Sequence, residues 1–279
     1  NRKSQYKRMA LSRVFQNGGA SAAQLLAGTL KSGVMGLVGG QLIGQAFSTL
    51  SLAYMIFRDD TFFIRLVRRR QIWVVARRYL RFPKYLILAH GISTASFQLP
   101  VFFFAVLFNP AVAGFYTLAQ RVFGAPMSLV AGAIGDFFRQ EASYKYLHEG
   151  NCRGIYRETF KKLLIISVFP FILFFFTAPQ LFTWLFGPAW SSSGEYAQIL
   201  APMFFLRFLT NPLSVMFLIA QRQGLDLAWQ CLLFTSIVLA LYAGYSEANV
   251  RSTLIFFSAA YSFMYFINGL LSYRLSFGR

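Results

Sequence analysis

Long windows without a charged residue are the feature that most constrains this chain. The stretches 32–57, 85–120 and 163–194 contain no Lys, Arg, Asp or Glu. A helix that crosses a bilayer needs about 20 mostly apolar residues, so each window is long enough for at least one. The chain is also 56% hydrophobic and only 13% charged, against roughly 25% charged in an ordinary globular domain. The sequence therefore predicts a polytopic membrane protein.

Turn signals divide these windows into separate helices. Clusters of Gly, Pro and charge mark the breaks, and "TAPQ" at 177–180 and "FGPAW" at 186–190 both read as loop. The predicted fold class is all-α, a polytopic transmembrane helical bundle of about eight helices. Their expected spans are 9–30, 34–57, 83–108, 111–138, 157–178, 195–220, 224–243 and 250–272.

The basic residues are distributed unevenly among the predicted loops. The formal net charge is +18, with 27 Lys and Arg against 9 Asp and Glu, which in a soluble protein would suggest a nucleic-acid partner. Most of these residues fall in 1–8, 58–84 and 139–162, which the helix count places on one side, whereas the opposite loops hold only Lys31 and Arg251. By the positive-inside rule, we expect both ends of this chain in the cytoplasm and no nucleic-acid partner.

Residues 70–81, within the most basic loop, have the pattern of an amphipathic helix. Arg70, Arg77, Arg78 and Arg81 share one arc at 100° per residue, and most of the apolar residues lie on the other face. This pattern favours a helix that lies on anionic phospholipid headgroups. A plain solvated loop is the alternative.

Polar side chains recur inside the spans, where exposure to lipid is costly. Those of the first span share one face, which should line a water-filled cavity or pack on another polar helix. Arg121 and Arg207 lie near mid-span with no acid at that depth, and arginine binds phosphate through its planar fork; hydrogen bonding to helix carbonyls is the alternative. The substrate-binding candidates are Arg13, Asn17, Gln24, Gln41, Gln45, His90, Gln98, Gln120, Arg121 and Arg207.

Catalytic signatures are absent from the sequence. It contains no HExxH, GxSxG, Walker or GxGxxG motif. The two cysteines, Cys152 and Cys231, form no metal-binding or disulfide pattern. We therefore expect no enzymatic activity, no metal and no cofactor, and leave proton or sodium coupling open.

Several stretches resemble a known family of transporters. "YKRMALSRVFQNGGASAAQLLAGTL", "FPKYLILAHGISTASFQLPVFFF" and "LFGPAWSSSGEYAQILAP" resemble helices of O-antigen and capsular polysaccharide flippases, within the multidrug/oligosaccharidyl-lipid/polysaccharide exporter superfamily. The resemblance implies a two-lobed exporter fold whose first lobe is incomplete here, lacking its N-terminal helices. Residues 1–57 would be the last two helices of the N-terminal lobe, 58–82 a basic cytoplasmic inter-lobe loop, and 83–279 the six-helix C-terminal lobe.

The same resemblance implies a function. Such a protein would be a flippase of lipopolysaccharide or other surface polysaccharide biosynthesis. It would move an undecaprenyl-pyrophosphate-linked oligosaccharide, such as an O-antigen unit, across the bacterial inner membrane by alternating access. Its partners would be that lipid-linked oligosaccharide and other polysaccharide assembly proteins.

Two alternatives remain. A cation-coupled small-molecule or drug exporter of the same superfamily would be favoured by an acidic residue inside the lobe. A polysaccharide polymerase or ligase would be favoured by a large periplasmic loop bearing Arg and His, whereas the loops predicted on that side are short.

Overall fold

The chain divides into two units, Asn1–Tyr79 and Leu80–Arg279. The second unit consists of helices that run back and forth. The computed structural model describes residues 81–278 and, before them, only scattered helical positions (35, 39, 42, 44–46, 49–50, 53–54, 73 and 77). The predicted first span, 9–30, lies outside the described residues, as does most of 34–57. Within 70–81, Trp73 and Arg77 are helical and the guanidinium of Arg77 lies 5.5 Å from the Trp73 ring centroid. Binding of this segment to lipid headgroups stays a prediction.

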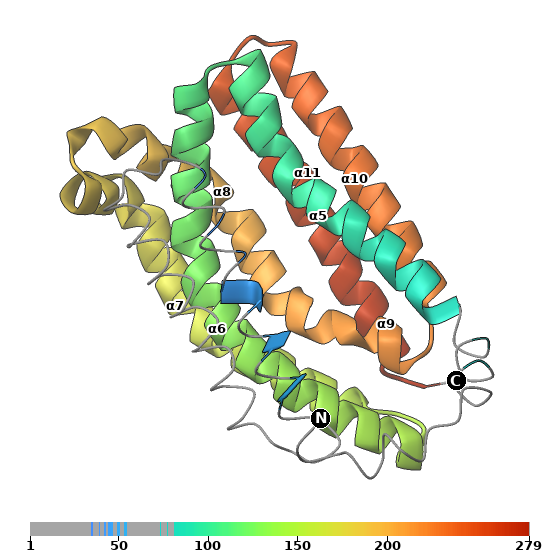
Figure 1. Ribbon diagram of the computed structural model, residues 1–279. Helices are drawn as coiled ribbons and strands as arrows, with labels where there is room; N and C mark the ends of the chain where they lie inside the picture. The colour runs from blue at the N-terminus through green and yellow to red at the C-terminus, as the bar shows by residue number, and fades with distance from the viewer. Residues whose placement is uncertain are drawn as a thin grey trace. The chain divides into compact units, whose positions relative to one another are not determined.

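Six helices form the body of the second unit, Leu80–Arg279, and they alternate in direction (Figure 1). They are α5 (Arg81–Leu107), α6 (Pro110–Glu149), α7 (Arg153–Phe186), α8 (Ser191–Thr210), α10 (Gln223–Tyr245) and α11 (Val250–Leu275). Three short elements connect them: the 3-10 helices η1 (Pro188–Trp190) and η2 (Asn211–Val215), and α9 (Met216–Ile219). No strand occurs in 81–278.

Local sequence explains where several helices begin and end. At the start of α6 the Asn109 side chain accepts a hydrogen bond from the Ala111 amide at 2.8 Å, and Pro110 takes the first helical position, where its missing N–H costs nothing. Asn249 caps α11 in the same way. Gly150 ends α6 in the left-handed conformation, with φ at +73°, which glycine adopts without strain.

Helix α8 lies at the centre of the unit and packs against α6, α7 and α11, while α10 packs against α5 and α11 (Figure 1). In the most apolar 18-residue stretch of Pro188–Ile219, half of the residues are buried, whereas 17% are buried in the corresponding stretch of α7. One core cluster joins residues such as Phe104, Tyr116 and Phe204, and a second, nearer the start of α7, includes Phe138 and Leu163.

Five segments of the described chain are long and apolar enough to cross a membrane: Tyr85–Leu107, Arg153–Phe186, Pro188–Ile219, Gln223–Tyr245 and Val250–Leu275. The predicted fold class, an all-α polytopic bundle, is thereby confirmed, and the chain is a multi-pass membrane protein. Helix α6 is the longest element at 40 residues but is not among the five. It carries polar and charged residues such as Ser128, Asp136 and Arg139, which line the cavity described below.

Three predicted boundaries are wrong. The "TAPQ" stretch is not a loop, because α7 continues through Pro179 to Phe186, with Ala178 fully buried and the Thr183 hydroxyl donating to the Pro179 carbonyl. Residues 139–162 are mostly helical, with a break only between Glu149 and Arg153. The predicted span 195–220 is interrupted by η2 after Thr210, since proline at 212 has no N–H to donate.

Replacing Gly194 should test the packing of α8 on α7. A Cβ at this position would lie 2.5 Å from the Pro179 Cα, so Gly194→Ala should force the helices apart and destabilise the protein by about 1–3 kcal/mol. The measurement is the melting temperature of the purified protein in detergent. Gly154→Ala is the control, because nothing lies within 4 Å of a Cβ at that position of α7. Equal melting temperatures for both variants would contradict the close packing.

Cys152 should react slowly with thiol reagents. Burial raises the pKa of its thiol from near 9 to about 11, and its Sγ lies 3.5 Å from the Met216 Sδ. In a Cys231→Ser variant, maleimide labelling of the folded protein should stay slow at pH 9 and accelerate toward pH 11, whereas the denatured protein should label readily at pH 9. Since the folded state holds this proton more tightly, the free energy of unfolding should fall as pH rises through this range. Rapid labelling of the folded protein at pH 8 would contradict the burial.

Candidate functional site

A polar cavity of about 620 Å³ opens between α5, α6, α10 and the η2–α9 segment. Its volume is within the range of about 300–1,000 Å³ typical of ligand pockets. Polar and apolar side chains contribute to its lining in similar measure. The polar lining residues are His90, Ser128, Asp136, Arg139, Asn211, Ser214, Gln223 and Asp226.

The cavity owes its shape to small residues on α6 and to the break after α8. Ser128, Gly132, Gly135 and Arg139 follow one another at helical spacing along α6 and line the same wall. A Cβ on Gly135 would lie 3.5 Å from the Pro212 Cβ, so the glycine lets η2 approach α6. The turn from α8 into η2 then brings Asn211 to the cavity wall.

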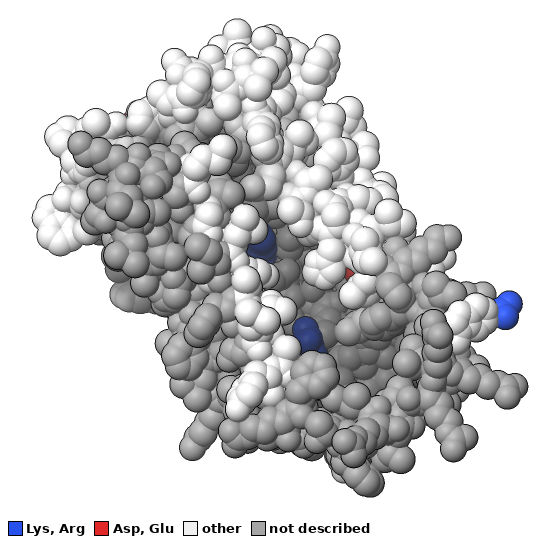
Figure 2. Space-filling model, in the orientation of Figure 1, with Lys and Arg blue, Asp and Glu red and all other residues white. Residues whose placement is uncertain are grey.

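Charged and titratable groups from three helices meet in this cavity. His90 comes from α5, Asp136 and Arg139 from α6, and Asp226 from the first turn of α10. Asp226 interacts electrostatically with His90 and shares a side-chain hydrogen bond with Gln230. Figure 2 shows cationic and acidic atoms recessed between the uncharged residues of this face. The cavity can therefore hold water and a polar ligand of mixed charge.

A second polar group surrounds Arg207 of α8 and includes residues of α5, α6 and α11. The Arg207 guanidinium carbon lies 4.5 Å from the Phe97 ring centroid, and its charge interacts with Tyr116, Tyr261 and Tyr265. The last two rings stack at 4.8 Å. Among the described residues, no carboxylate lies within ion-pair distance of Arg207. Aromatic faces and phenol oxygens thus stabilise the cation without neutralising it.

Gln120 joins the Arg207 group. It is only 7% exposed, and its Nε2 lies 3.4 Å from the Tyr116 hydroxyl and 3.5 Å from the Phe97 carbonyl oxygen. Two of the predicted site residues, Gln120 and Arg207, are thus brought together through Tyr116 and Phe97.

Of the remaining predicted site residues in the six-helix unit, one lines the polar cavity. His90 lines the cavity, whereas Gln98 and Arg121 are exposed on α5 and α6 and do not line it. Gln45 is a helical, exposed residue of the first unit. The other four lie outside the described residues: Arg13, Asn17, Gln24 and Gln41.

Seven polar residues of the cavity were not predicted as part of the site: Ser128, Asp136, Arg139, Asn211, Ser214, Gln223 and Asp226. Asp136 and Arg139 lie where the sequence predicted the end of a helix and the start of a loop, Asp226 lies in the first turn of α10, and Asn211 is an isolated amide next to a proline. One signal was present for α6, the small and polar stripe Ser128–Gly132–Gly135–Arg139 on a single face. No sequence signal joined it to Asp226, which lies on another helix. Among the described residues, no three His, Cys, Asp or Glu side chains lie close enough together to hold a metal ion.

Comparison with known proteins assigns the chain to a family. The family described as "Polysaccharide biosynthesis protein" matches residues 1–195, which include α5, α6, α7 and the first turn of α8. Searches of the curated proteins and of the solved structures returned no match. The matched region covers well over half of the sequence and includes two of the helices that surround the polar groups described above, α5 and α6. The chain therefore belongs to the family of polysaccharide biosynthesis proteins.

Proposed function

We propose that this protein is a flippase that moves a polyprenyl-pyrophosphate-linked oligosaccharide across the bacterial inner membrane by alternating access, and that it is not an enzyme. Membership of a polysaccharide biosynthesis family and a bundle of membrane-crossing helices support this proposal. A hydrophilic sugar cannot cross lipid by itself, since each polar group would lose its hydration. The transporter must therefore offer a wet, polar surface inside the bundle.

The polar cavity is the observation that carries the proposal. It combines one cation, Arg139, and two carboxylates, Asp136 and Asp226, with amide, hydroxyl and imidazole groups, which together can hydrogen-bond with sugar hydroxyls, and Arg139 is suited to a phosphate. It also shares helices with the Arg207 group. Arg207 precedes Asn211 by one turn, and Phe97 follows His90 by two turns on the same face of α5. Polar side chains therefore extend from the cavity farther into the bundle.

Arg207 is the best candidate contact for the pyrophosphate. Its guanidinium is retained among aromatic rings with no acid among the described residues, and a buried cation without a counterion favours an anionic ligand. Arg121, exposed on α6, and Arg13, outside the described residues, remain proposed contacts on the argument from the sequence.

Replacing these arginines should stop polysaccharide export. Arg13→Ala, Arg121→Ala and Arg207→Ala should each abolish surface polysaccharide while the protein remains in the membrane, because each removes a charge that holds the pyrophosphate. The readouts are the amount of surface polysaccharide and the amount of the protein in membranes. Arg251→Gln is the control, because Arg251 lies at the end of the bundle opposite the polar cavity. Lipid-linked oligosaccharide should accumulate on the cytoplasmic leaflet. Wild-type polysaccharide in all three variants would defeat the assignment.

The cavity should also govern transport. Arg139→Gln should lower the rate of export about 10- to 100-fold, because a hydrogen bond to a charged group contributes about 1.5–3 kcal/mol. Arg222→Gln is the matched control, since Arg222 is exposed at the same end of the bundle and does not line the cavity. The rate of appearance of newly labelled polysaccharide at the cell surface measures the effect. Equal rates in the two variants would remove the cavity from the transport path.

One observation favours the second candidate, a cation-coupled small-molecule exporter. The sequence showed no acidic residue inside the lobe, yet Asp226 and Asp136 line the cavity, and Asp226 interacts electrostatically with His90 there. A carboxylate beside an imidazole suits proton binding. Proton coupling of this kind is compatible with either cargo. If Asp226→Asn abolished drug efflux while surface polysaccharide persisted, the result would favour the small-molecule exporter.

A further inference from the structure

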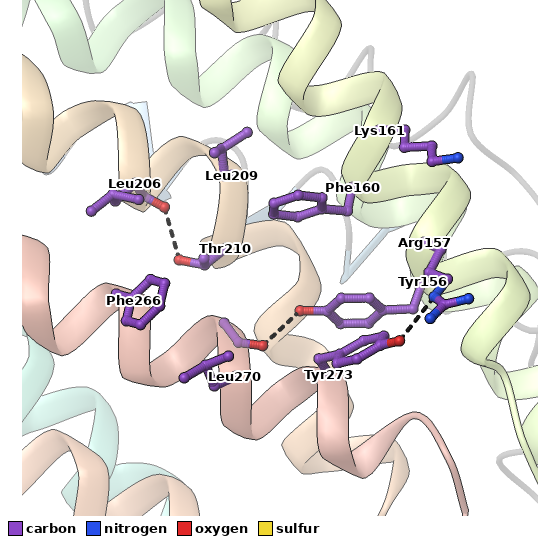
Figure 3. A pocket seen from close by; sticks show the side chains of 11 residues that line it. Tyr156, Arg157, Phe160, Lys161, Leu206, Leu209, Thr210, Phe266, Leu270 and Tyr273 are labelled. Carbon is purple, nitrogen blue, oxygen red and sulfur yellow. Dashed lines mark hydrogen bonds between the residues drawn. The ribbon is translucent and has the colours of Figure 1, made fainter.

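A second cavity, of about 510 Å³, lies between α7, α8 and α11 and shares no lining residue with the polar cavity (Figure 3). We call it the lateral groove. Its lining residues are Tyr156, Arg157, Phe160, Lys161, Leu206, Leu209, Thr210, Phe266, Gly269, Leu270 and Tyr273. Most of the lining is apolar, and the two cations among these residues both belong to α7.

The apolar part of the groove is open to its surroundings. Phe266 and Leu270 of α11 are 53% and 50% exposed, and Phe160 and Leu206 face them across the groove (Figure 3). Helices α7, α8 and α11 all belong to membrane-crossing segments. An open apolar groove between such helices is a surface for hydrocarbon chains.

The cationic end of the groove has an unusual arrangement of charge. The Nε atoms of Arg153 and Arg157 both donate to the hydroxyl oxygen of Tyr273, at 3.1 and 2.8 Å. Two guanidinium groups thus converge on one neutral atom, where they repel each other. Lys161 adds a third positive charge one turn along α7.

No acid of the described chain neutralises this cluster. Glu158 is the nearby carboxylate on α7, but its Oε1 accepts a hydrogen bond from Lys162 at 2.7 Å, and neither residue lines the groove. Within 81–278, no carboxylate lies within ion-pair distance of Arg153, Arg157 or Lys161. The Tyr273 hydroxyl, which already accepts two bonds, still has its own proton to donate. The cluster therefore fits an external anion with several acceptor oxygens.

We propose that the lateral groove binds one anionic diacyl phospholipid of the surrounding bilayer. Its phosphate bonds to Arg157, Lys161 and the Tyr273 hydroxyl, and one acyl chain lies along Phe160, Leu206 and Leu270. The cations occupy the first turns of α7, so the phosphate lies at the membrane edge, where a phospholipid headgroup resides. Basic pockets joined to an apolar surface are the physical pattern of such lipid sites.

Thermal stability of the purified full chain in a neutral detergent tests the proposal. Dioleoyl phosphatidylglycerol should raise the melting temperature by about 4–8 °C at saturation, and dioleoyl phosphatidylethanolamine, with the same acyl chains, should raise it far less. Arg157→Gln/Lys161→Gln should lose most of the phosphatidylglycerol shift. Lys162→Gln is the matched control, because it removes one charge from the same helix but outside the groove, and it should keep the shift.

A second variant separates the groove from its charges. Leu270→Trp keeps every cation but fills the apolar part, so it should reduce the phosphatidylglycerol shift as well. If Arg157→Gln/Lys161→Gln has a lower melting temperature without lipid, Leu270→Trp still tests whether the groove binds phosphatidylglycerol. Equal shifts with the two phospholipids, or loss of the shift in Lys162→Gln, would overturn the proposal. The proposal would also be overturned if a polyprenyl pyrophosphate raised the melting temperature through Arg157 and Lys161 and phosphatidylglycerol did not. The occupant of the groove would then be the transported lipid.

Discussion

Close packing of α8 against its neighbours is the constraint on which the rest of the six-helix unit depends. Within lipid, apolar side chains gain little by leaving one hydrocarbon surface for another, so helices associate through tight contact at small residues. Gly194, Ala197 and Ala201 of α8 are buried, and Gly194 lies directly against Pro179 of α7. On α11, a Cβ at Gly269 would lie 2.9 Å from the Thr210 Cγ2. Small residues at both ends of α8 therefore determine where α7 and α11 lie.

The central position of α8 also explains why the unit has two different hollows. On the side of α6, the break into η2 leaves polar groups such as Asn211 beside the charged residues of other helices. On the side of α7 and α11, Leu206 and Leu209 form an apolar floor. One helix thus separates a polar cavity suited to a hydrated ligand from a groove suited to a lipid chain. The proposed transport and the proposed lipid binding would use different side chains, so substitutions should disrupt them separately.

The helices themselves were largely predictable. The expected spans overlapped all six helices of 81–278. For the five that can cross lipid this follows from their apolar composition, which is a local property, whereas α6 extends beyond its predicted span into a charged segment. Boundaries failed where tertiary contacts outweighed local signals. Pro179 reads as a helix breaker, yet α7 passes through it because Ala178 and Phe182 are fully buried on α8. The candidate site was only partly predictable. Arg207, Gln120 and His90 were identified by their cost in lipid. Asp226, in the first turn of α10, and Arg139, in a stretch predicted to be a loop, gave no such signal.

By itself, the sequence determined that this chain is a multi-pass helical membrane protein and which family it belongs to. Only the tertiary structure decided which polar side chains meet. His90 and Asp226 line one cavity and interact electrostatically, and two arginines of α7 converge on Tyr273 of α11. The physical reason is that helical periodicity places residues on a face of their own helix, whereas the rotation of that face toward a partner depends on packing between segments far apart in the sequence.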